Sequence, residues 1–223
     1  IDMSEFGIPQ NRKRVIILGV NKEYYKDKSN EILNAFYCEI LPSLKEKKKT
    51  VRDAIGDLPK LFPAKKVYRK NGRRYSHTQP QINVENHLPR FHNERDISIF
   101  RMLAEDIENG INKYINIEEL KKLYTKMTGK RSNVHKYYVL RWDEQSNTIP
   151  AHLFKDGLRH IHPDPSQARS LTVREAARLQ TFDDDYVFVG STTHQYKMIG
   201  NAVPPMFSNK LANAIYILIN RFG

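Results

Sequence analysis

Three polar side chains with hydrogen-bonding chemistry, Gln10, Arg12 and Arg14, come at alternate positions directly before a short apolar run. Residues two apart point to the same side of an extended backbone, so Arg12 and Arg14 could reach into one site. Arginine suits such a site because its charge is permanent and its planar fork of donors is rigid. The alternative is that both arginines are solvated and only flank a strand.

A second group of residues near the C-terminus indicates a close backbone contact and two helix starts. In Gly200-Asn-Ala-Val-Pro-Pro205 the glycine allows close approach, and prolines are tolerated in a helix's first turn. Upstream, Thr172 is a good N-cap, and Glu175 three residues later completes a capping box. Residues four apart share a helix face, which places Arg174 and Arg178 on one side.

These residues need a strand and a helix to position them. Residues 15–20 are a continuous β-branched apolar run, which is typical of a strand buried on both faces. The last helix presents a wide apolar face that must be covered. We expect this face to pack on the strand or to cause self-association. The face consists of Leu211, Ala214, Ile215, Leu218, Ile219 and Phe222.

Two stretches combine basic and aromatic residues. Residues 60–75 hold seven basic residues and no acid, and Lys70-Asn-Gly-Arg73 predicts a hairpin turn. Residues 130–141 form the second stretch. A basic hairpin with interleaved tyrosines suits contact with a phosphate backbone, although a solvated surface hairpin is the alternative.

The composition agrees with a polyanionic partner. The 223 residues carry a formal net charge of +12, which favours such a partner but also fits simple solubility. One cysteine, Cys38, excludes a disulfide within the chain and fits a reducing compartment. The sequence contains no apolar run of membrane-spanning length and no signal peptide, so we expect a cytoplasmic protein.

The remaining sequence predicts helices and no metal site. Helical apolar spacing begins at Ile99 and continues to Ile107, and a second helix is expected over residues 117–127. Thr50 can cap a short helix. His152, His160 and His162 are not expected to bind a metal, because no acid or cysteine completes the set.

Three segments resemble motifs of the DNA (cytosine-5)-methyltransferase family, in the family's order. They are Gly7-Ile-Pro-Gln-Asn-Arg-Lys-Arg14, Arg169-x-Leu-Thr-x-Arg-Glu-x-Ala-Arg-Leu-Gln180 and Gly200-Asn-Ala-Val-Pro-Pro205. The resemblance implies a mixed α/β fold, namely the C-terminal piece of a Rossmann-like methyltransferase with a small DNA-recognition domain. It divides the chain into residues 1–59 (end of the catalytic domain), 60–190 (target recognition, with the capped helix 172–180) and 191–223 (final motif and returning helix).

The resemblance also implies roles for individual residues. Arg14 is expected to contact the target cytosine and Arg12 to support the site. Asn201 and Ala202 are expected to line a pocket for S-adenosylmethionine. Basic residues of the recognition region are expected to bind double-stranded DNA, namely Lys65, Lys66, Arg69, Lys70, Arg73, Arg74, Lys130, Arg131, Lys136, Arg169 and Arg174.

Three other family elements do not occur in the sequence: the Gly-rich cofactor loop, the Pro-Cys nucleophile and the Glu-Asn-Val motif. All precede the first motif found here in family order, and the chain begins with Ile1 rather than methionine. We therefore expect a C-terminal portion that needs an N-terminal catalytic part and is inactive alone. A non-catalytic DNA-binding module, or a relative acting on RNA, are the alternatives.

Overall fold

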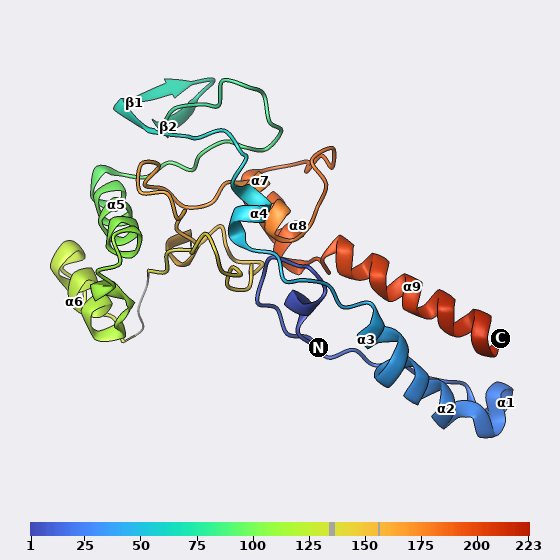
Figure 1. Cartoon of the computed structure of the whole chain (residues 1–223). Coiled ribbons are helices and arrows are strands. Elements are labelled where there is room, and N and C mark those ends of the chain that lie inside the picture. The colour runs from blue at the N-terminus through green and yellow to red at the C-terminus, as the bar shows by residue number, and fades with distance from the viewer. Residues whose placement is uncertain (134–136, 156) are drawn as a thin grey trace.

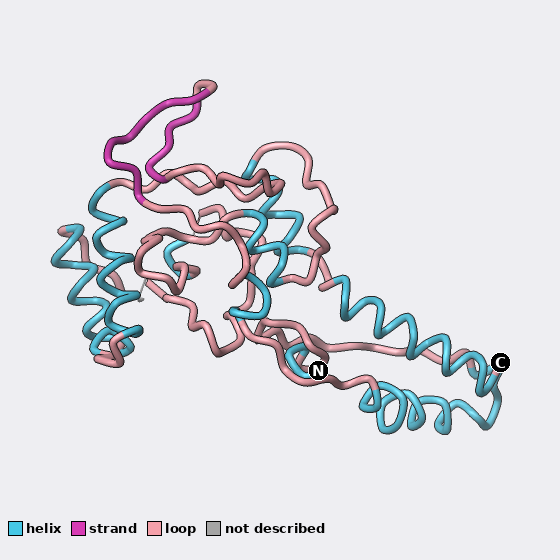
Figure 2. Tube along the Cα trace, turned by 45° about the horizontal axis from the view of Figure 1, so that its top comes forward, coloured by secondary structure: helices cyan, strands magenta, loops and turns pink. Residues whose placement is uncertain are grey.

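The computed structural model describes residues 1–133, 137–155 and 157–223. Figure 1 shows an elongated molecule in which a helical arm leaves a central region, with a hairpin and a helix pair on the other side. Most of the described chain outside the helices is irregular, and the hairpin is its only sheet (Figure 2). Its helices are α1 (Lys22–Tyr25), α2 (Ser29–Asn34), α3 (Leu41–Ser43), α4 (Val51–Ile55), α5 (Glu94–Glu108), α6 (Ile117–Thr128), α7 (Val173–Leu179), α8 (Thr192–Asn201) and α9 (Pro205–Phe222), with short 3₁₀ or π stretches η1 (Met3–Glu5), η2 (Lys26–Lys28), η3 (Ala35–Ile40), η4 (Lys113–Ile115) and η5 (Gly157–Arg159).

The arm consists of α9 packed beside a second helical rod, in which α2 continues through η3 into α3 (Figure 1). Phe36 of the rod and Phe207, Ala214 and Leu218 of α9 are buried in a shared apolar cluster. The predicted apolar face of α9 is therefore covered, with one exception. Ile219 is 55% exposed, so its assignment to the covered face was wrong.

The prediction of a doubly buried strand at residues 15–20 was also wrong. The segment is extended, with Leu18 packed against the arm cluster and Val15 and Ile17 84% and 89% exposed. Within the described residues its main chain bonds to one side chain: Leu18 N–H donates to the Tyr37 hydroxyl (2.9 Å), which in turn donates to Ile16 O (3.0 Å). A strand needs a neighbouring strand for its hydrogen bonds, and none pairs with this segment within the described residues.

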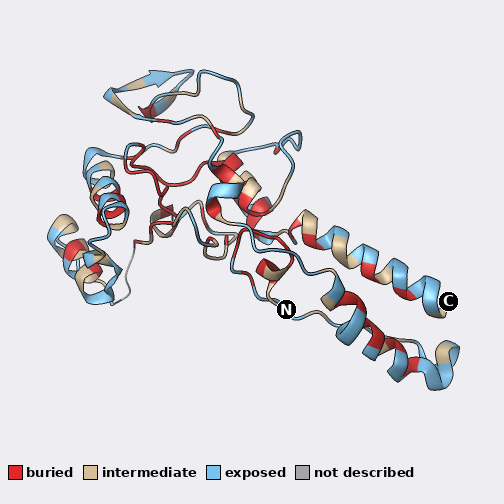
Figure 3. Cartoon of the chain, viewed as in Figure 1, coloured by how far each residue is buried: buried red, intermediate tan, exposed pale blue. Residues whose placement is uncertain are grey.

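Two capping boxes organise the central region: the predicted box at Thr172 is confirmed, and the predicted cap at Thr50 is also part of a box. Thr50 and Asp53 start α4, and Thr172 and Glu175 start α7. The two helices pack together and against α8 around a buried apolar cluster that includes Ile55. Figure 3 shows buried residues here, along the arm and in the helix pair.

The remaining lobe carries the helix pair and the hairpin. The predicted apolar stripes of α5 and α6 are confirmed, with Ile99, Leu103, Leu120 and Leu123 buried between them. Strands β1 (Pro63–Lys70) and β2 (Arg73–His77) pair in antiparallel fashion. The expected turn closes them, because Asn71 and Gly72 both have positive φ (49° and 75°).

The apolar clusters each draw residues from distant parts of the chain. The arm cluster joins residues 3–44 with α9, and the central cluster joins α4, α7 and α8. The three predicted domain ranges therefore share cores, and their boundaries remain a prediction. No helix in the described ranges combines the length and apolar character that a membrane crossing requires.

Candidate functional site

The loop that carries Gln10 and Arg12 is fixed by main-chain hydrogen bonds on both sides. Met3 N–H donates to Arg12 O (2.9 Å), and Asn11 N–H donates to Ser146 O (2.8 Å). The loop is thus clamped between η1 and residues 145–149, which directs the side chains of Gln10 and Arg12 inward.

Arg12 is buried and ties this loop to the C-terminal motif. One guanidinium nitrogen donates to Gly200 O and Ala202 O (both 3.2 Å), and the other donates to Ile149 O (3.2 Å). Burial, with a smaller contribution from the charge of Arg14, lowers the pKa of Arg12 to about 10, so Arg12 stays charged at neutral pH. Its Nε is buried and has no hydrogen-bond partner among the described residues.

Two buried glutamines extend the network to the end of α7. Gln10 Nε2 donates to Leu179 O and to Gln180 Oε1 (both 3.2 Å), while Gln10 Oε1 accepts from Ile149 N–H (3.0 Å). Gln180 Nε2 donates to Ile199 O (2.8 Å) in α8. Side chains of the first two motifs therefore contact each other and the main chain of the third.

Gly200 allows this convergence because it has no side chain. A Cβ added there would lie 2.3 Å from Pro150 C and from Ala151 N. Both contacts are to backbone, which cannot rotate away as a side chain can. The close approach expected at Gly200 is confirmed, and it sets the end of α8 against residues 149–151.

The residues expected to contact ligands lie at the edge of this network. Arg14 is exposed, and its guanidinium donates to the adjacent Lys13 O (2.7 Å). Arg12 and Arg14 thus differ in burial although both lie near the same loop. Asn201 is exposed and Ala202 is half-buried, with its carbonyl oxygen occupied by Arg12.

Arg169 forms a buried ion pair with the capping residue Glu175. Its two terminal nitrogens donate to the two carboxylate oxygens at 2.7 and 2.6 Å, and both side chains are 1% exposed. Burial alone would raise the pKa of Glu175, but the charge and hydrogen bonds of Arg169, with smaller contributions from His162 and His87, together outweigh burial and lower this pKa strongly. The same carboxylate accepts from Thr172 N–H (2.7 Å), so the ion pair and the helix cap are one unit.

Arg169 and Arg174 are too deeply buried for the expected contact with DNA. Arg174 is fully buried and donates to the carbonyl oxygens of Glu85, Asp183 and Tyr186 at 2.9–3.0 Å. Both guanidinium groups are used inside the protein, so we correct these two assignments to structural roles.

The hairpin presents its cations outward, as the sequence predicts. Five of its six expected DNA-binding residues are exposed and Arg73 is half-buried: Lys65, Lys66, Arg69, Lys70, Arg73 and Arg74. None of the six forms an ion pair within the described part of the chain. Tyr68 and Tyr75 stack beneath them, with ring centroids 5.3 Å apart.

Two histidines fasten the hairpin to the segment before α7. His77 Nε2 of β2 is hydrogen-bonded to Gln167 O (2.9 Å). His92, outside the hairpin, donates its main-chain N–H to Ser76 Oγ of β2 (2.9 Å) and accepts from Ser170 N–H at its Nε2 (3.2 Å). Burial lowers the pKa of His77 to about 4 and that of His92 to about 3, so both are neutral at pH 7. The hairpin is therefore held in place by neutral hydrogen bonds.

The second basic stretch lies at the α6 end of the lobe. Lys130 and Arg131 are exposed, whereas Lys136 lies outside the described residues. In the described part of the chain, no three His, Cys, Asp or Glu side chains are grouped as metal ligands would be. His160 instead contacts Thr148 O (3.3 Å), and His162 faces Glu175 at 3.6 Å.

Sequence reasoning missed Gln180 as part of the site, although it ends the second motif. It also missed His87, whose ring bridges Thr172 Oγ1 (3.0 Å) and Pro59 O (2.8 Å). The signal for Gln180 was its place in Arg-Leu-Gln at the end of a capped helix. His87 carries no local signal, because its partners are distant in the sequence.

Comparison with known proteins places these motifs in one family. Residues 1–216 match the model of the C-5 cytosine-specific DNA methylases. A type II methyltransferase of Bacillus paralicheniformis is 37% identical over 99% of this chain, which covers 50% of that relative. DNA (cytosine-5)-methyltransferase 4 of Arabidopsis thaliana is 29% identical over 97% of this chain and 17% of its own length. The chain therefore spans half or less of these two proteins.

A solved structure supports the fold. It is described as a DNA modification methyltransferase encoded within an Escherichia coli prophage, and it matches 99% of this chain and 59% of its own chain. The TM-score is 0.53 at 22% identity, which supports the expected mixed α/β, Rossmann-like methyltransferase fold. On the family match and the motifs together, this chain belongs to the C-5 cytosine-specific DNA methylases.

Proposed function

We propose that this chain is the DNA-recognising, site-completing part of a DNA (cytosine-5)-methyltransferase. The reaction would transfer a methyl group from S-adenosylmethionine to C5 of cytosine in a specific duplex sequence. The observation that carries the proposal is the Arg12–Gln10–Gln180 network, which brings the three motifs to one place. A generic basic binding protein would not require this convergence.

Arg14 is proposed to contact the target cytosine. The base must first leave the stack, at a cost of about a few kcal/mol. Arg12 ties the loop to Ile149, Gly200 and Ala202 by three hydrogen bonds, so the exposed fork of Arg14 projects from a fixed backbone. Donors aimed at developing negative charge contribute roughly 2.7–4 kcal/mol each to the transition state.

Asn201 and Ala202 are proposed to line one edge of the cofactor pocket. The exposed Asn201 amide offers both a donor and an acceptor, and Val203 beside it is 53% exposed. A polar group next to an apolar surface fits a ligand with polar and apolar parts, as S-adenosylmethionine has. When bound, that cofactor supplies the methyl group.

A complementary part is proposed to pair with residues 15–20. Val15 and Ile17 are exposed apolar side chains on an extended segment without a partner strand in the described structure. Such an edge is a template for another strand. The complementary part would bring the Pro-Cys nucleophile and the Gly-rich cofactor loop.

The basic hairpin is proposed to contact duplex DNA, together with Lys130 and Arg131. Their exposed charges suit phosphate oxygens, whereas base reading would come from side chains that enter the major groove. Lys136 remains a predicted contact, and the buried Arg169 and Arg174 are left out.

The test is Arg14→Ala in the enzyme completed by its complementary part. We expect single-turnover methylation to slow by roughly 10²–10³, with little loss of duplex affinity. Arg14→Lys should restore little of the methylation rate, because the point charge of lysine cannot replace the planar fork of donors of the guanidinium group. Lys13→Ala is the matched control, since Lys13 is an exposed neighbouring cation.

Other results would contradict this role. A phosphate contact would lower affinity and shrink the salt slope by about one while leaving the single-turnover rate at saturating DNA unchanged. An unchanged rate for Arg14→Ala refutes the catalytic assignment. Absence of any methylation by the completed wild-type enzyme would favour a non-catalytic DNA-binding module.

A further inference from the structure

The turn at residues 151–155 meets α8 around one aromatic ring. Lys155 Nζ lies 5.5 Å from the centroid of the Phe154 ring, and Lys197 Nζ of α8 lies 5.4 Å from it. Both lysines are exposed, whereas Phe154 is half-buried against the central cluster. Two ammonium groups from distant parts of the chain therefore share one ring, which offers each a cation–π contact.

Arg90 holds the turn at residues 151–155 against α8. Its guanidinium donates to Leu153 O (3.0 Å) and Phe154 O (2.7 Å) and lies 5.7 Å from the Tyr196 ring in α8. Gly157 makes room for it, because an added Cβ would lie 2.4 Å from an Arg90 nitrogen. The turn and α8 are thus joined by a residue that adds further positive charge.

The platform formed by Phe154, Lys155 and Lys197 carries two exposed positive charges. Neither lysine forms an ion pair within the described residues, and neither do Arg90 or Arg159 nearby. Helix α8 carries no acidic residue. Two like charges that share one ring favour a polyanionic ligand.

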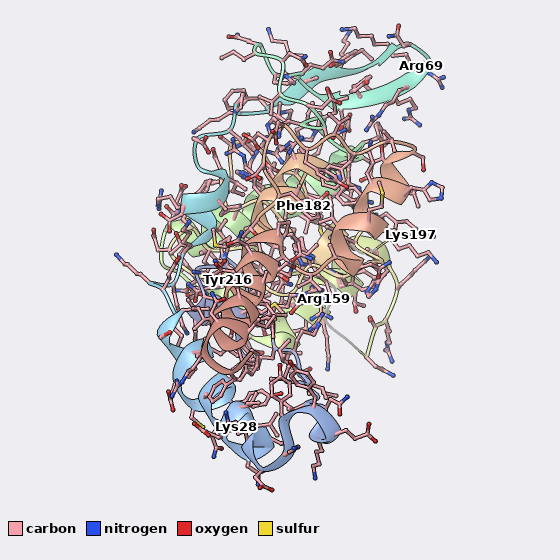
Figure 4. The ribbon with its side chains drawn as sticks, turned by 90° about the vertical axis from the view of Figure 1, so that its right-hand side faces the viewer. Lys28, Arg69, Arg159, Phe182, Lys197 and Tyr216 are labelled. Carbon is pink, nitrogen blue, oxygen red and sulfur yellow. The ribbon has the colours of Figure 1, made fainter. Side chains whose placement is uncertain are left out.

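The platform lies next to Asn201 of the proposed cofactor pocket, on the helix whose C-terminal end binds the Arg12 loop through Gly200 O and Ala202 O. Lys197 and Asn201 are both exposed and four residues apart, so they share one face of α8 at a separation of about 6 Å along its axis. Figure 4 shows Lys197 towards the same edge of the molecule as Arg69 of the hairpin, with Lys28 at the far end of the arm. The platform and the hairpin therefore lie on one edge of the molecule.

We propose that Lys155 and Lys197 form a second phosphate-binding point for duplex DNA, beside the proposed cofactor pocket. This rests on the proposed function and adds a contact that neither basic stretch of the sequence contains. The shared ring and Arg90 fix both ammonium groups before DNA arrives, so less side-chain freedom is lost on binding. The hairpin and the platform would then contact the duplex at two separate places.

The test compares three double variants of the full chain, each losing two positive charges. Lys155→Gln/Lys197→Gln removes the platform charges, and Lys66→Gln/Arg69→Gln removes two hairpin charges. Lys22→Gln/Lys28→Gln is the matched control, because these exposed lysines lie on the arm and form no ion pair in the described structure. Affinity for a short mixed-sequence duplex is measured by fluorescence anisotropy at several KCl concentrations.

The platform variant should flatten the slope of log K against log salt by about 1.8, since each released phosphate contact contributes about 0.9. The hairpin variant should show a similar change, and the arm variant should match the parent. Circular dichroism and thermal melting should be unchanged in all three, because the substituted side chains are exposed.

Each other outcome overturns the inference in a recognisable way. If only the hairpin variant shows a flatter salt slope, the platform does not contact phosphate, and the proposed function still stands. Equal flattening in all three variants indicates a bulk charge effect. No change in any variant would overturn both the platform and DNA binding by this chain.

Discussion

The buried pair of Arg169 and Glu175 makes a stability prediction that can be worked from its geometry. Glu175→Gln keeps the shape of the side chain but removes its charge and places an NH₂ group against the Arg169 donors. Arg169, 1% exposed, is then a buried charge without a counterion. Breaking one partner of a buried pair costs about 3–5 kcal/mol, out of a total stability of roughly 5–15 kcal/mol.

Urea unfolding at neutral pH measures this loss, as the change in midpoint multiplied by the slope m. Glu118→Gln is the matched control. It makes the same chemical change in the exposed Glu118–Lys121 pair (2.9 Å), where the side chains are 69% and 29% exposed. Exposed pairs contribute about 0–1 kcal/mol. High salt should leave the Glu175→Gln loss nearly intact, since buried charges are screened little.

A loss for Glu175→Gln no larger than that of the control would refute this reasoning. It would mean that the ion pair contributes nothing beyond the helix cap. The double change Arg169→Met/Glu175→Leu should recover part of the stability, because it leaves no unpaired charge.

Further predictions concern pH, close packing and the C-terminal helix. His77, His92, His160 and His162 have pKa values lowered by burial to about 3–4, so their stabilisation is complete above the unfolded value of about 6.5 and is lost as pH falls towards 3. At pH 5 each of these buried histidines would lower the free energy of unfolding by on the order of 2 kcal/mol. Urea midpoints that stay equal between pH 7 and pH 5 would contradict this. Gly200→Ala should cost about 1–3 kcal/mol or more in urea unfolding, whereas Gly19→Ala, where an added Cβ meets nothing within 4 Å, should cost under about 1 kcal/mol. Leu218→Asp should destabilise the arm strongly and Ile219→Asp little, because Leu218 is 7% and Ile219 55% exposed; equal melting temperatures for the two variants would exclude the observed packing of α9.

Features that depend on residues close together in the sequence could be predicted. Both capping boxes join residues three positions apart, so Thr50 and Thr172 identify helix starts without knowledge of the fold. The hairpin turn at Asn71 and Gly72 is likewise set by two residues that tolerate positive φ. The membership of the three motifs in one family was also readable, because a motif is a local pattern.

Burial and partner choice were decided by the tertiary structure. Arg12 and Arg14 look alike in the sequence, yet only Arg12 meets the carbonyls of residues 200 and 202, which are 188 and 190 positions away. Arg169 looks like a surface cation until the chain folds Glu175 back onto it. Residues 15–20 read as a doubly buried strand, but a strand forms only where another strand supplies hydrogen bonds. Local composition fixes what a side chain can do, whereas the distant residues packed around it determine whether it faces water, a ligand or another buried group.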